Sequence, residues 1–326
     1  MVNAQRVHAT GPAEMMKWEE LSLAEPGPGE ARVRHRAIGV NYIDIYFRSG
    51  LYPAPTGLPF VPGQEGCGIV EAVGEGVSAV KPGDRVAYVG PLGSYATARN
   101  VPADRLVLVP DGVDDAIAAG MMLKGMTVQY LLRRTYRVTP ETVMLFHAAA
   151  GGVGLIAGQW ARHLGVRTII GTVGSDAKAE LARAAGYTHV INYRSQDFVA
   201  EVRKITEGAG CDVVYDSVGK DTFPGSLDCL RPLGMWVTFG NASGNVPDFS
   251  PGLLSQKGSL FMTRPSLFAY IAKRADLEAT AADLFDVVKK GAVEIQLNQT
   301  YALIDAIAAH KDLEARRTTG TTVLLP

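Results

Sequence analysis

A cluster of very small residues within positions 143–165 has the composition of a site for a phosphate-bearing ligand. Residues 143–146 form a short apolar run without charge, which is typical of a parallel strand covered on both faces. Three alanines at 148–150 then precede Gly151, Gly152 and Gly154. Such a run lets the backbone turn sharply and lets an anion approach the N–H groups of a following helix, where the helix dipole is positive. The pattern predicts a site for the pyrophosphate of a dinucleotide.

The residues after the next predicted strand, 166–173, indicate which dinucleotide binds. An NAD-type site places Asp or Glu about 20 residues beyond the first glycines, where the carboxylate holds the ribose 2′-hydroxyl. This chain has Gly174 and Ser175 there, and Lys178 follows one helical turn later. Lys178 by itself could equally be a solvated helix residue, so the missing carboxylate is the stronger part of the argument. The sequence favours NADP(H).

The context of the glycines supports this prediction, because a glycine-rich turn alone also occurs for plain backbone reasons. Strands and helices alternate through residues 123–263, which is typical of an α/β Rossmann fold with a doubly wound parallel sheet. Beyond the two strands already named, we expect strands at 189–192, 212–216, 235–239 and 259–263, and helices at 176–185 and 195–206. We assign residues 123–263 to a dinucleotide-binding domain.

The residues on either side of this domain have a different composition. Residues 1–122 are rich in Gly and Pro, and their turns punctuate short predicted strands, which indicates a partly barrel-like β domain. The strands are expected at 30–40, 68–73, 85–89 and 105–109, and a helix over 114–134 marks the crossing into the second domain. Residues 264–326, with helices at 277–289 and 303–313 and strands at 293–298 and 321–325, are expected to return to the first domain.

Length, charge and cysteine content limit the classes of function. A chain of 326 residues is long enough for two domains, and a formal net charge of −1 gives no reason to expect nucleic acid as a partner. The three cysteines have no CxxC spacing, which favours reduced thiols in a cytoplasmic protein. No apolar run reaches the roughly 18 residues that a membrane span needs.

Several motifs together resemble the zinc-free quinone oxidoreductases, the zeta-crystallin branch of the medium-chain dehydrogenase/reductase superfamily. The resemblance extends over nearly the whole chain and implies a Rossmann domain beside a GroES-like catalytic domain. The motifs that carry it are Gly39-Val40-Asn41-Tyr42-Ile43-Asp44, Pro62-Gly63-Gln64-Glu65, Lys81-Pro82-Gly83-Asp84-Arg85-Val86, Ala149-Ala150-Gly151-Gly152-Val153-Gly154 with Gln159 and Arg162, Asp216-Ser217-Val218-Gly219, and Gln256-Lys257-Gly258-Ser259.

The same resemblance implies a site without metal. The zinc alcohol dehydrogenases of the superfamily have Cys at the position of Asn41 and His at the position of Gln64, and neither amide is an ordinary zinc ligand. Cys67 is the only cysteine nearby, and it has no partner at ligand spacing. Without a Lewis acid to stabilise an alkoxide, alcohol oxidation becomes difficult. We therefore expect the reduction of an acceptor that is already electron-poor, such as a quinone.

The expected acceptor site takes its residues from the segment that the family places over the nicotinamide. The candidate catalytic residues are Asn41, Tyr46, Tyr52 and Gln64. The two tyrosines could bond an acceptor oxygen or stack on its ring, or they could simply pack with apolar neighbours. The two amides could bond ligand, or they could satisfy the backbone. No general acid stands out, so solvent could supply the proton, and His147 is expected to be a packed, hydrogen-bonded residue.

The resemblance also implies positions along the coenzyme. Thr127 corresponds to a contact near the nicotinamide phosphate, and Tyr193 and Arg316 correspond to neighbours of the 2′-phosphate, with Arg317 as the alternative to Arg316. The expected NADPH-binding residues are Asn41, Thr127, Ala150, Gly151, Gly152, Val153, Gly154, Gly174, Ser175, Lys178, Tyr193, Ser217, Phe239, Gly240, Ser243 and Arg316.

Three functions remain open at this point. The first is NADPH-dependent quinone reduction, by hydride or electron transfer from the nicotinamide, and the second is NADPH-dependent reduction of the carbon–carbon double bond of an enone or alkenal. The third is a non-catalytic NADPH-binding role, crystallin-like or RNA-binding, although no basic, aromatic-rich cluster favours RNA. We also expect a homodimer, because Leu260, Phe261 and Met262 would leave an apolar strand at the open edge of the sheet; a helix of the same chain could cover that edge instead.

Overall fold

The computed structural model describes residues 1–326, and the chain forms two compact units. Unit 1 comprises Met1–Met126, Ile271–Lys289 and Ile295–Pro326, and unit 2 comprises Thr127–Tyr270 and Lys290–Glu294. Helix α2 (Asp115–Tyr130) runs through the first boundary without a break, and five residues of π-helix follow it at Leu131–Thr135. None of the helices is both long and apolar enough to cross a membrane.

Unit 2 is built on a parallel sheet of six strands in the order β10-β9-β8-β11-β12-β13. The strands are β8 (Val143–Phe146), β9 (Thr168–Val173), β10 (His189–Asn192), β11 (Cys211–Asp216), β12 (Leu230–Thr238) and β13 (Phe261–Thr263). Sequence order reverses between β8 and β11, and open α/β sheets bind ligands at such a switch point. The predicted α/β class and doubly wound sheet are confirmed.

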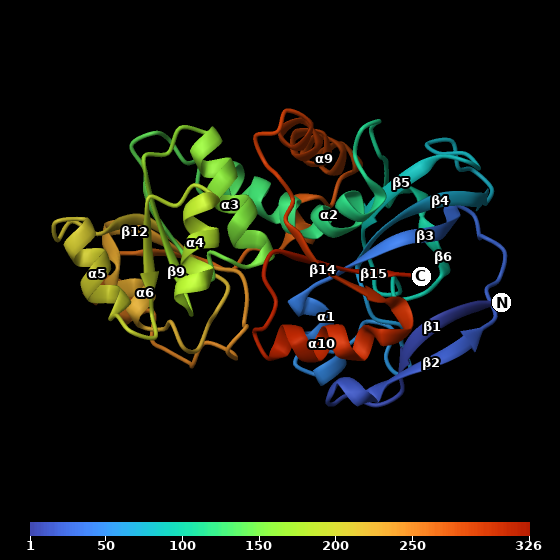
Figure 1. Cartoon of the computed structure of the whole chain (residues 1–326), viewed down its shortest axis with the longest axis horizontal. Helices are drawn as coiled ribbons and strands as arrows, with labels where there is room; N and C mark the ends of the chain where they lie inside the picture. Colours follow the sequence, from blue (N-terminus) through green and yellow to red (C-terminus); the bar gives the residue numbers. More distant parts are fainter. The chain divides into compact units, whose positions relative to one another are not determined.

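Helices connect these strands and bury their apolar sides. They are α3 (Gly152–His163), α4 (Asp176–Ala184), α5 (Phe198–Ile205), α6 (Gly225–Asp228), α7 (Gly252–Gln256) and α8 (Leu267–Tyr270). Leu145, Ile170, Val214 and Trp236 belong to one buried cluster that joins four neighbouring strands. Figure 1 shows α3 and α4 in front of the sheet. In the chain, α3 is the helix that follows β8.

Unit 1 is built on a mainly antiparallel sheet in the order β14-β15-β3-β4-β5-β7, with β6 also paired to β3. The strands are β3 (Glu30–Val40), β4 (Glu65–Val73), β5 (Arg85–Val89), β6 (Ala98–Pro102), β7 (Leu106–Leu108), β14 (Leu297–Ala302) and β15 (Thr321–Leu325), and a separate pair is formed by β1 (Val2–Val7) and β2 (Met16–Leu21). In Figure 1 the C-terminal β15 (red) lies beside β3 (blue). Strand β15 thus returns to the sheet of unit 1. The bounds differ from those expected, since residues 264–270 and 290–294 belong to unit 2 and residues 123–126 belong to unit 1.

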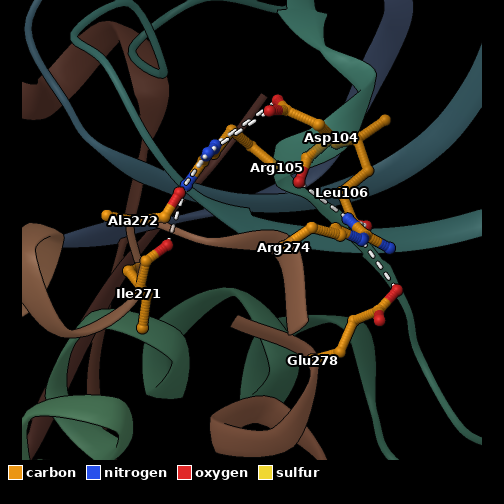
Figure 2. A network of polar contacts seen from close by, with 7 residues as sticks. All are labelled: Asp104, Arg105, Leu106, Ile271, Ala272, Arg274 and Glu278. Carbon is orange, nitrogen blue, oxygen red and sulfur yellow. Dashed lines mark hydrogen bonds and ion pairs between the residues drawn. The ribbon is translucent and has the colours of Figure 1, made fainter. Parts of the chain in front are cut away.

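The helices of unit 1 are α1 (Tyr42–Ser49), α9 (Arg274–Lys289) and α10 (Ala306–Glu314), with most of α2. Two arginines tie the start of α9 to the turn before β7 (Figure 2). Arg105 donates to the carbonyls of Ile271 (2.9 Å) and Ala272 (3.0 Å), and Arg274 donates to those of Asp104 (2.8 Å) and Leu106 (2.6 Å). These bonds give side-chain donors to four backbone carbonyls.

One predicted strand and one predicted exposure are wrong. The strand expected at 293–298 begins at Leu297 instead, because its partner β15 begins opposite at Thr321 and no other strand is paired with the preceding residues. Val293 and Ile295 are buried without belonging to a strand, and this alternating burial explains the apolar pattern. At the open edge, Leu260 is buried rather than exposed, whereas Phe261 and Met262 are exposed.

A buried polar chain holds the start of α1 against α10. Asp44 accepts hydrogen bonds from the backbone N–H of Asn41 (2.9 Å) and from the Tyr95 hydroxyl (3.1 Å), and Tyr95 Oη lies 2.9 Å from His310 Nε2. Burial raises the pKa of Asp44 to about 7. Burial, aided by the Arg48 charge, lowers the pKa of His310 to about 3. His310 is therefore a neutral imidazole that donates to Tyr95.

We predict that His310 makes the protein less stable in acid. The pKa of His310 is about 3 in the folded protein, against an ordinary value of 6.5. At pH values between these two, the unfolded chain binds a proton at His310 that the folded chain does not, so the free energy of unfolding falls as the pH falls. H310Q should flatten this dependence in urea titrations across that pH window, whereas H163Q, at an exposed histidine, should leave it as in the wild type. An unchanged slope in H310Q would contradict the assignment.

Candidate functional site

The turn between β8 and α3 in unit 2 brings backbone, not side chains, to the carboxyl edge of the sheet. Ala148 adopts a left-handed conformation (φ 58°), and the Gly151 N–H donates to its carbonyl at 3.0 Å. A Cβ atom at Gly154 would lie 2.4 Å from Ala148 O and 2.6 Å from Ala149 O. Only glycine therefore allows α3 to begin this close to the turn.

The first turn of α3 suits a pyrophosphate. Its N-cap is Gly151, which has no side chain to accept a hydrogen bond, and no acidic residue lies in that turn. Helices α4 and α5, by contrast, are capped by the side chains of Ser175 and Asp197. The first N–H groups of α3 thus have no side-chain acceptor, and the positive end of the helix dipole is not offset by a carboxylate.

The edge after β9 carries the residues expected near a 2′-phosphate. A Cβ atom at Gly174 would lie 2.6 Å from Tyr193 Oη, so the tyrosine ring covers the glycine backbone. The Tyr193 N–H donates to Val173 O at 3.1 Å, and Ser175 Oγ accepts from the Lys178 N–H at 3.3 Å. The nearest carboxylate in sequence, Asp176, accepts from Asn192 Nδ2 at 2.9 Å. The structure therefore brings Gly174, Ser175, Lys178 and Tyr193 together.

The loops after β11 and β12 pack on each other through backbone contacts. A Cβ atom at Gly240 would lie 2.5 Å from Ser217 O. Ser243 Oγ donates to Val218 O (2.9 Å) and accepts from the Asp221 N–H (2.9 Å), so this hydroxyl holds the loop itself. Phe239 packs beside Phe146. Of the remaining candidates, Thr127 is buried on α2 in unit 2, and Arg316 belongs to unit 1.

In unit 1, a buried ion pair holds Asn41. Glu65 is fully buried, and its Oε1 accepts from Asn41 Nδ2 (2.7 Å) and from Lys124 Nζ (3.0 Å). Its Oε2 accepts from the Leu123 N–H at 2.7 Å, and Lys124 also donates to Val40 O at 3.1 Å. Both charges therefore have several partners, which offsets the free-energy cost of removing them from water.

Gln64, next to this pair, is buried with one polar atom unsatisfied. Its Nε2 donates to Gly90 O at 3.2 Å, and Gly90 N donates back to the Gln64 carbonyl at 2.8 Å. Gln64 Oε1 has no partner although it is buried. Because a buried acceptor without a donor is costly, this oxygen fits a water molecule or a hydroxyl of a ligand.

The two tyrosines of the expected acceptor site are neighbours. Tyr46 is buried on α1, and Tyr52 is half-buried in the turn that follows this helix. Their ring centroids lie 5.2 Å apart in an edge-to-face arrangement, and Phe47 makes a similar contact with Tyr52. The Tyr52 N–H also donates to Tyr46 O at 3.0 Å. Three aromatic rings, those of Tyr46, Phe47 and Tyr52, therefore pack together at this point of unit 1.

The side chains around Asn41 and Gln64 do not suit a zinc ion. Both amide nitrogens already donate hydrogen bonds, and Glu65, the carboxylate that accepts from Asn41 Nδ2, is paired with an ammonium 3.0 Å away. A second cation at Glu65 would be repelled by Lys124. No group of three or more His, Cys, Asp and Glu side chains with metal-binding spacing is found in the chain.

Three buried charged residues, Glu65, Lys124 and Asp216, were not among the predicted site residues, and the sequence carried a signal for one of them. Lys124 interrupts an otherwise apolar stretch of α2, and a charge at such a place needs a buried partner. Asp216 belongs to the motif Asp216-Ser217-Val218-Gly219, but only the fold shows its hydrogen-bond partners. The expectation that His147 is packed and hydrogen-bonded is confirmed, since its ring nitrogens lie near Thr172 Oγ1 (2.9 Å) and Ser226 Oγ (3.1 Å).

Comparison with known proteins gives the family. Residues 27–111 match the alcohol dehydrogenase GroES-like domain, and residues 152–286 match the zinc-binding dehydrogenase domain. A quinone oxidoreductase of Pseudomonas aeruginosa is 54% identical, over 98% of this chain and 98% of the relative. A 2-haloacrylate reductase of a Burkholderia species is 48% identical, over 100% of this chain and 99% of the relative. The Escherichia coli quinone oxidoreductase solved with NADPH superimposes with a TM-score of 0.97 at 47% identity, over 99% of this chain and 100% of that one.

Glycine turn, sheet order and full-length similarity therefore agree: the chain belongs to the quinone oxidoreductase family of the medium-chain dehydrogenase/reductase superfamily.

Proposed function

We propose that this protein is an NADPH-dependent quinone oxidoreductase that works without a metal ion. The observation that carries the proposal is the glycine-capped start of α3, whose first turn has neither a side-chain cap nor an acid. It is supported by the solved Escherichia coli relative, which is a complex with NADPH. When bound, the coenzyme supplies a hydride to the acceptor, and a proton from solvent completes the hydroquinone.

The residues of this chain bind and orient the reactants. We assign the pyrophosphate to the backbone of Ala150, Gly151, Gly152, Val153 and Gly154, and the 2′-phosphate to Ser175, Lys178 and Tyr193 beside Gly174, with Arg316 as a further candidate. We assign the rest of the coenzyme to Asn41, Thr127, Ser217, Phe239, Gly240 and Ser243. Tyr46 and Tyr52 would orient the ring of the acceptor, and Gln64 Oε1 would accept a hydrogen bond from a water molecule or a ligand hydroxyl.

A second candidate function is reduction of an activated carbon–carbon double bond. The relative named 2-haloacrylate reductase is 48% identical to this chain, and two of the quinone oxidoreductases are 48% and 50% identical. Both reactions deliver a hydride to a conjugated acceptor, so the coenzyme site serves either. The size and polarity of the acceptor site would decide between them.

The three cysteines bear on where the enzyme works. Cys67, Cys211 and Cys229 are buried free thiols. Burial, as the largest cause, raises the pKa of each thiol well above its ordinary value, so none is a ready nucleophile. We infer that the protein works in a reducing compartment such as the cytoplasm.

The exposed edge of the sheet in unit 2 suits a second copy of the chain. Strand β13 pairs only with β12, and Phe261 (57% exposed) and Met262 (40% exposed) lie on it, with Leu233 (59% exposed) in neighbouring β12. Edge strands with exposed apolar side chains are usually covered. We propose a homodimer in which the β13 edges of two copies lie together, related by a two-fold axis.

Turnover assays test the chemistry. We expect NADPH oxidation with simple quinones to exceed that with 2-haloacrylates and enones, and we expect the rate to be the same after treatment with a chelator, because no residue assigned to the site is a zinc ligand. Faster turnover of the haloacrylate would favour the second candidate function. Loss of activity with chelator, restored by zinc, would contradict a metal-free reaction.

Coenzyme preference tests the edge after β9. Because a charge-assisted hydrogen bond is worth about 1.5–3 kcal/mol, K178M should raise the KM for NADPH about ten- to a hundredfold and leave the KM for NADH nearly unchanged. K204M, at a lysine on α5 whose side chain is 78% exposed, is the matched control and should change neither. Equal effects of K178M on the two coenzymes would rule out a contact with the 2′-phosphate.

Sedimentation tests the dimer. The wild type is expected to sediment as a dimer in analytical ultracentrifugation, and F261K with M262K should sediment as a monomer, because four like charges would meet at a two-fold contact. F268K, at another partly exposed apolar residue of unit 2, serves as the control and should remain dimeric. A wild type that is monomeric at micromolar concentration would overturn the proposal.

A further inference from the structure

A fully buried carboxylate at the end of β11 organises the loop that follows this strand. Asp216 Oδ1 accepts from the backbone N–H groups of Val218 (2.8 Å) and Gly219 (3.1 Å). Its Oδ2 accepts from the hydroxyls of Thr222 (2.8 Å) and Ser226 (2.8 Å) and from Trp236 Nε1–H (3.3 Å). Burial opposes ionisation of Asp216, but the hydrogen bonds from Ser226, Thr222 and Val218 stabilise the carboxylate, and the pKa of the carboxyl lies below its ordinary value. The group is therefore an anion whose two oxygens are both used.

The negative charge of Asp216 dictates the direction of a chain of hydrogen bonds. Because an ionised carboxylate only accepts, the Ser226 hydroxyl must donate to it. Ser226 Oγ, 3.1 Å from His147 Nε2, must then accept from an Nε2–H group. His147 Nδ1, 2.9 Å from Thr172 Oγ1, consequently carries a lone pair and accepts from that hydroxyl. Since burial lowers the pKa of His147, the imidazole stays neutral, with its proton on Nε2.

His147 is the residue that leads directly into the glycine turn. Its backbone N–H donates to Tyr215 O at 3.0 Å, and Ala148, in the left-handed conformation, follows it. The Ala149 N–H donates to Thr172 O at 3.0 Å, so Thr172 holds both the ring of His147 and the backbone of the turn. The chain Asp216–Ser226–His147–Thr172 thus joins the ends of β8, β9 and β11 at the edge where the uncapped α3 begins.

We propose that Asp216 is a positioning residue for coenzyme binding: its charge fixes the proton of His147 on Nε2 and thereby holds the glycine turn in the geometry that receives the pyrophosphate. Asp216 is fully buried and acts through Ser226 and His147. The inference rests on the proposed use of NADPH. Asp216 would thus be a part of the coenzyme site that does not itself contact the ligand.

The substitution D216N separates charge from shape. An asparagine that keeps its oxygen toward Val218 and Gly219 turns an NH2 group toward Ser226. The Ser226 hydroxyl must then accept from the amide and donate to His147, which moves the imidazole proton to Nδ1. We expect 15N NMR of histidine-labelled protein without coenzyme to show the Nε2–H form of His147 in the wild type and the Nδ1–H form in D216N. The Nδ1–H form in the wild type would overturn the proposal.

Direct binding of NADPH gives the second measurement. We expect D216N to raise the Kd for NADPH about tenfold, which corresponds to the net worth of one or two hydrogen bonds, while kcat at saturating coenzyme changes little. S226A breaks the chain between Asp216 and His147 but keeps the carboxylate, so it should raise the Kd similarly and provides the test if D216N does not fold. T222V, which removes a different hydroxyl from the same oxygen, is the control and should change the Kd less than about twofold.

The outcomes separate this inference from the proposed function. If the wild type does not bind NADPH, the proposed function fails. If the wild type binds NADPH and both D216N and S226A bind it equally well, the proposed function stands and the role of Asp216 is refuted. A Kd raised as much by T222V as by S226A would also refute it, because the effect would then be general to the buried cluster.

Discussion

The contact on which the coenzyme site depends is the close approach of α3 to the turn before it. At Gly154 a single added carbon would lie 2.4 Å from a backbone carbonyl, so any side chain there would push the helix away from the sheet edge. This approach aims the uncapped N–H groups and the helix dipole at one place. Because backbone groups form this site, its geometry depends on the side chains that hold the backbone in place. Some residues that shape the site therefore do not contact the ligand.

One buried carboxylate in each unit holds residues of the candidate site, and both of its oxygens have hydrogen-bond donors. In unit 2, Asp216 collects backbone and hydroxyl donors at the end of β11. In unit 1, Glu65 is paired with Lys124 and orients the amide of Asn41 at the start of α1. An uncompensated charge at either place would cost several kcal/mol, so these partners are expected to be as sensitive to substitution as the candidate site residues themselves.

Much of the fold was predictable because local patterns and tertiary structure agree. The strands at 30–40, 85–89, 143–146, 189–192 and 321–325 have the predicted bounds. The first alternates polar and buried residues over much of its length, and the others are short segments with adjacent apolar residues. The strand at 293–298 was wrong, because its apolar alternation reflects burial and the pairing partner sets where a strand begins. The unit boundary within α2 has no local signal, because the helix continues through it.

The sequence by itself determined the class of ligand, a dinucleotide, and the preference for NADP(H). The glycines act through local backbone geometry and the missing acid through local charge, and both are decided by neighbouring residues in the chain. It also indicated that amides stand at the positions where the zinc enzymes of the superfamily have ligands. Only the tertiary structure decided what those amides bond, that Lys124 neutralises Glu65, and that His147 is joined to Asp216 through Ser226. Those partners lie between ten and 79 positions apart in the chain, so no sequence spacing could have paired them.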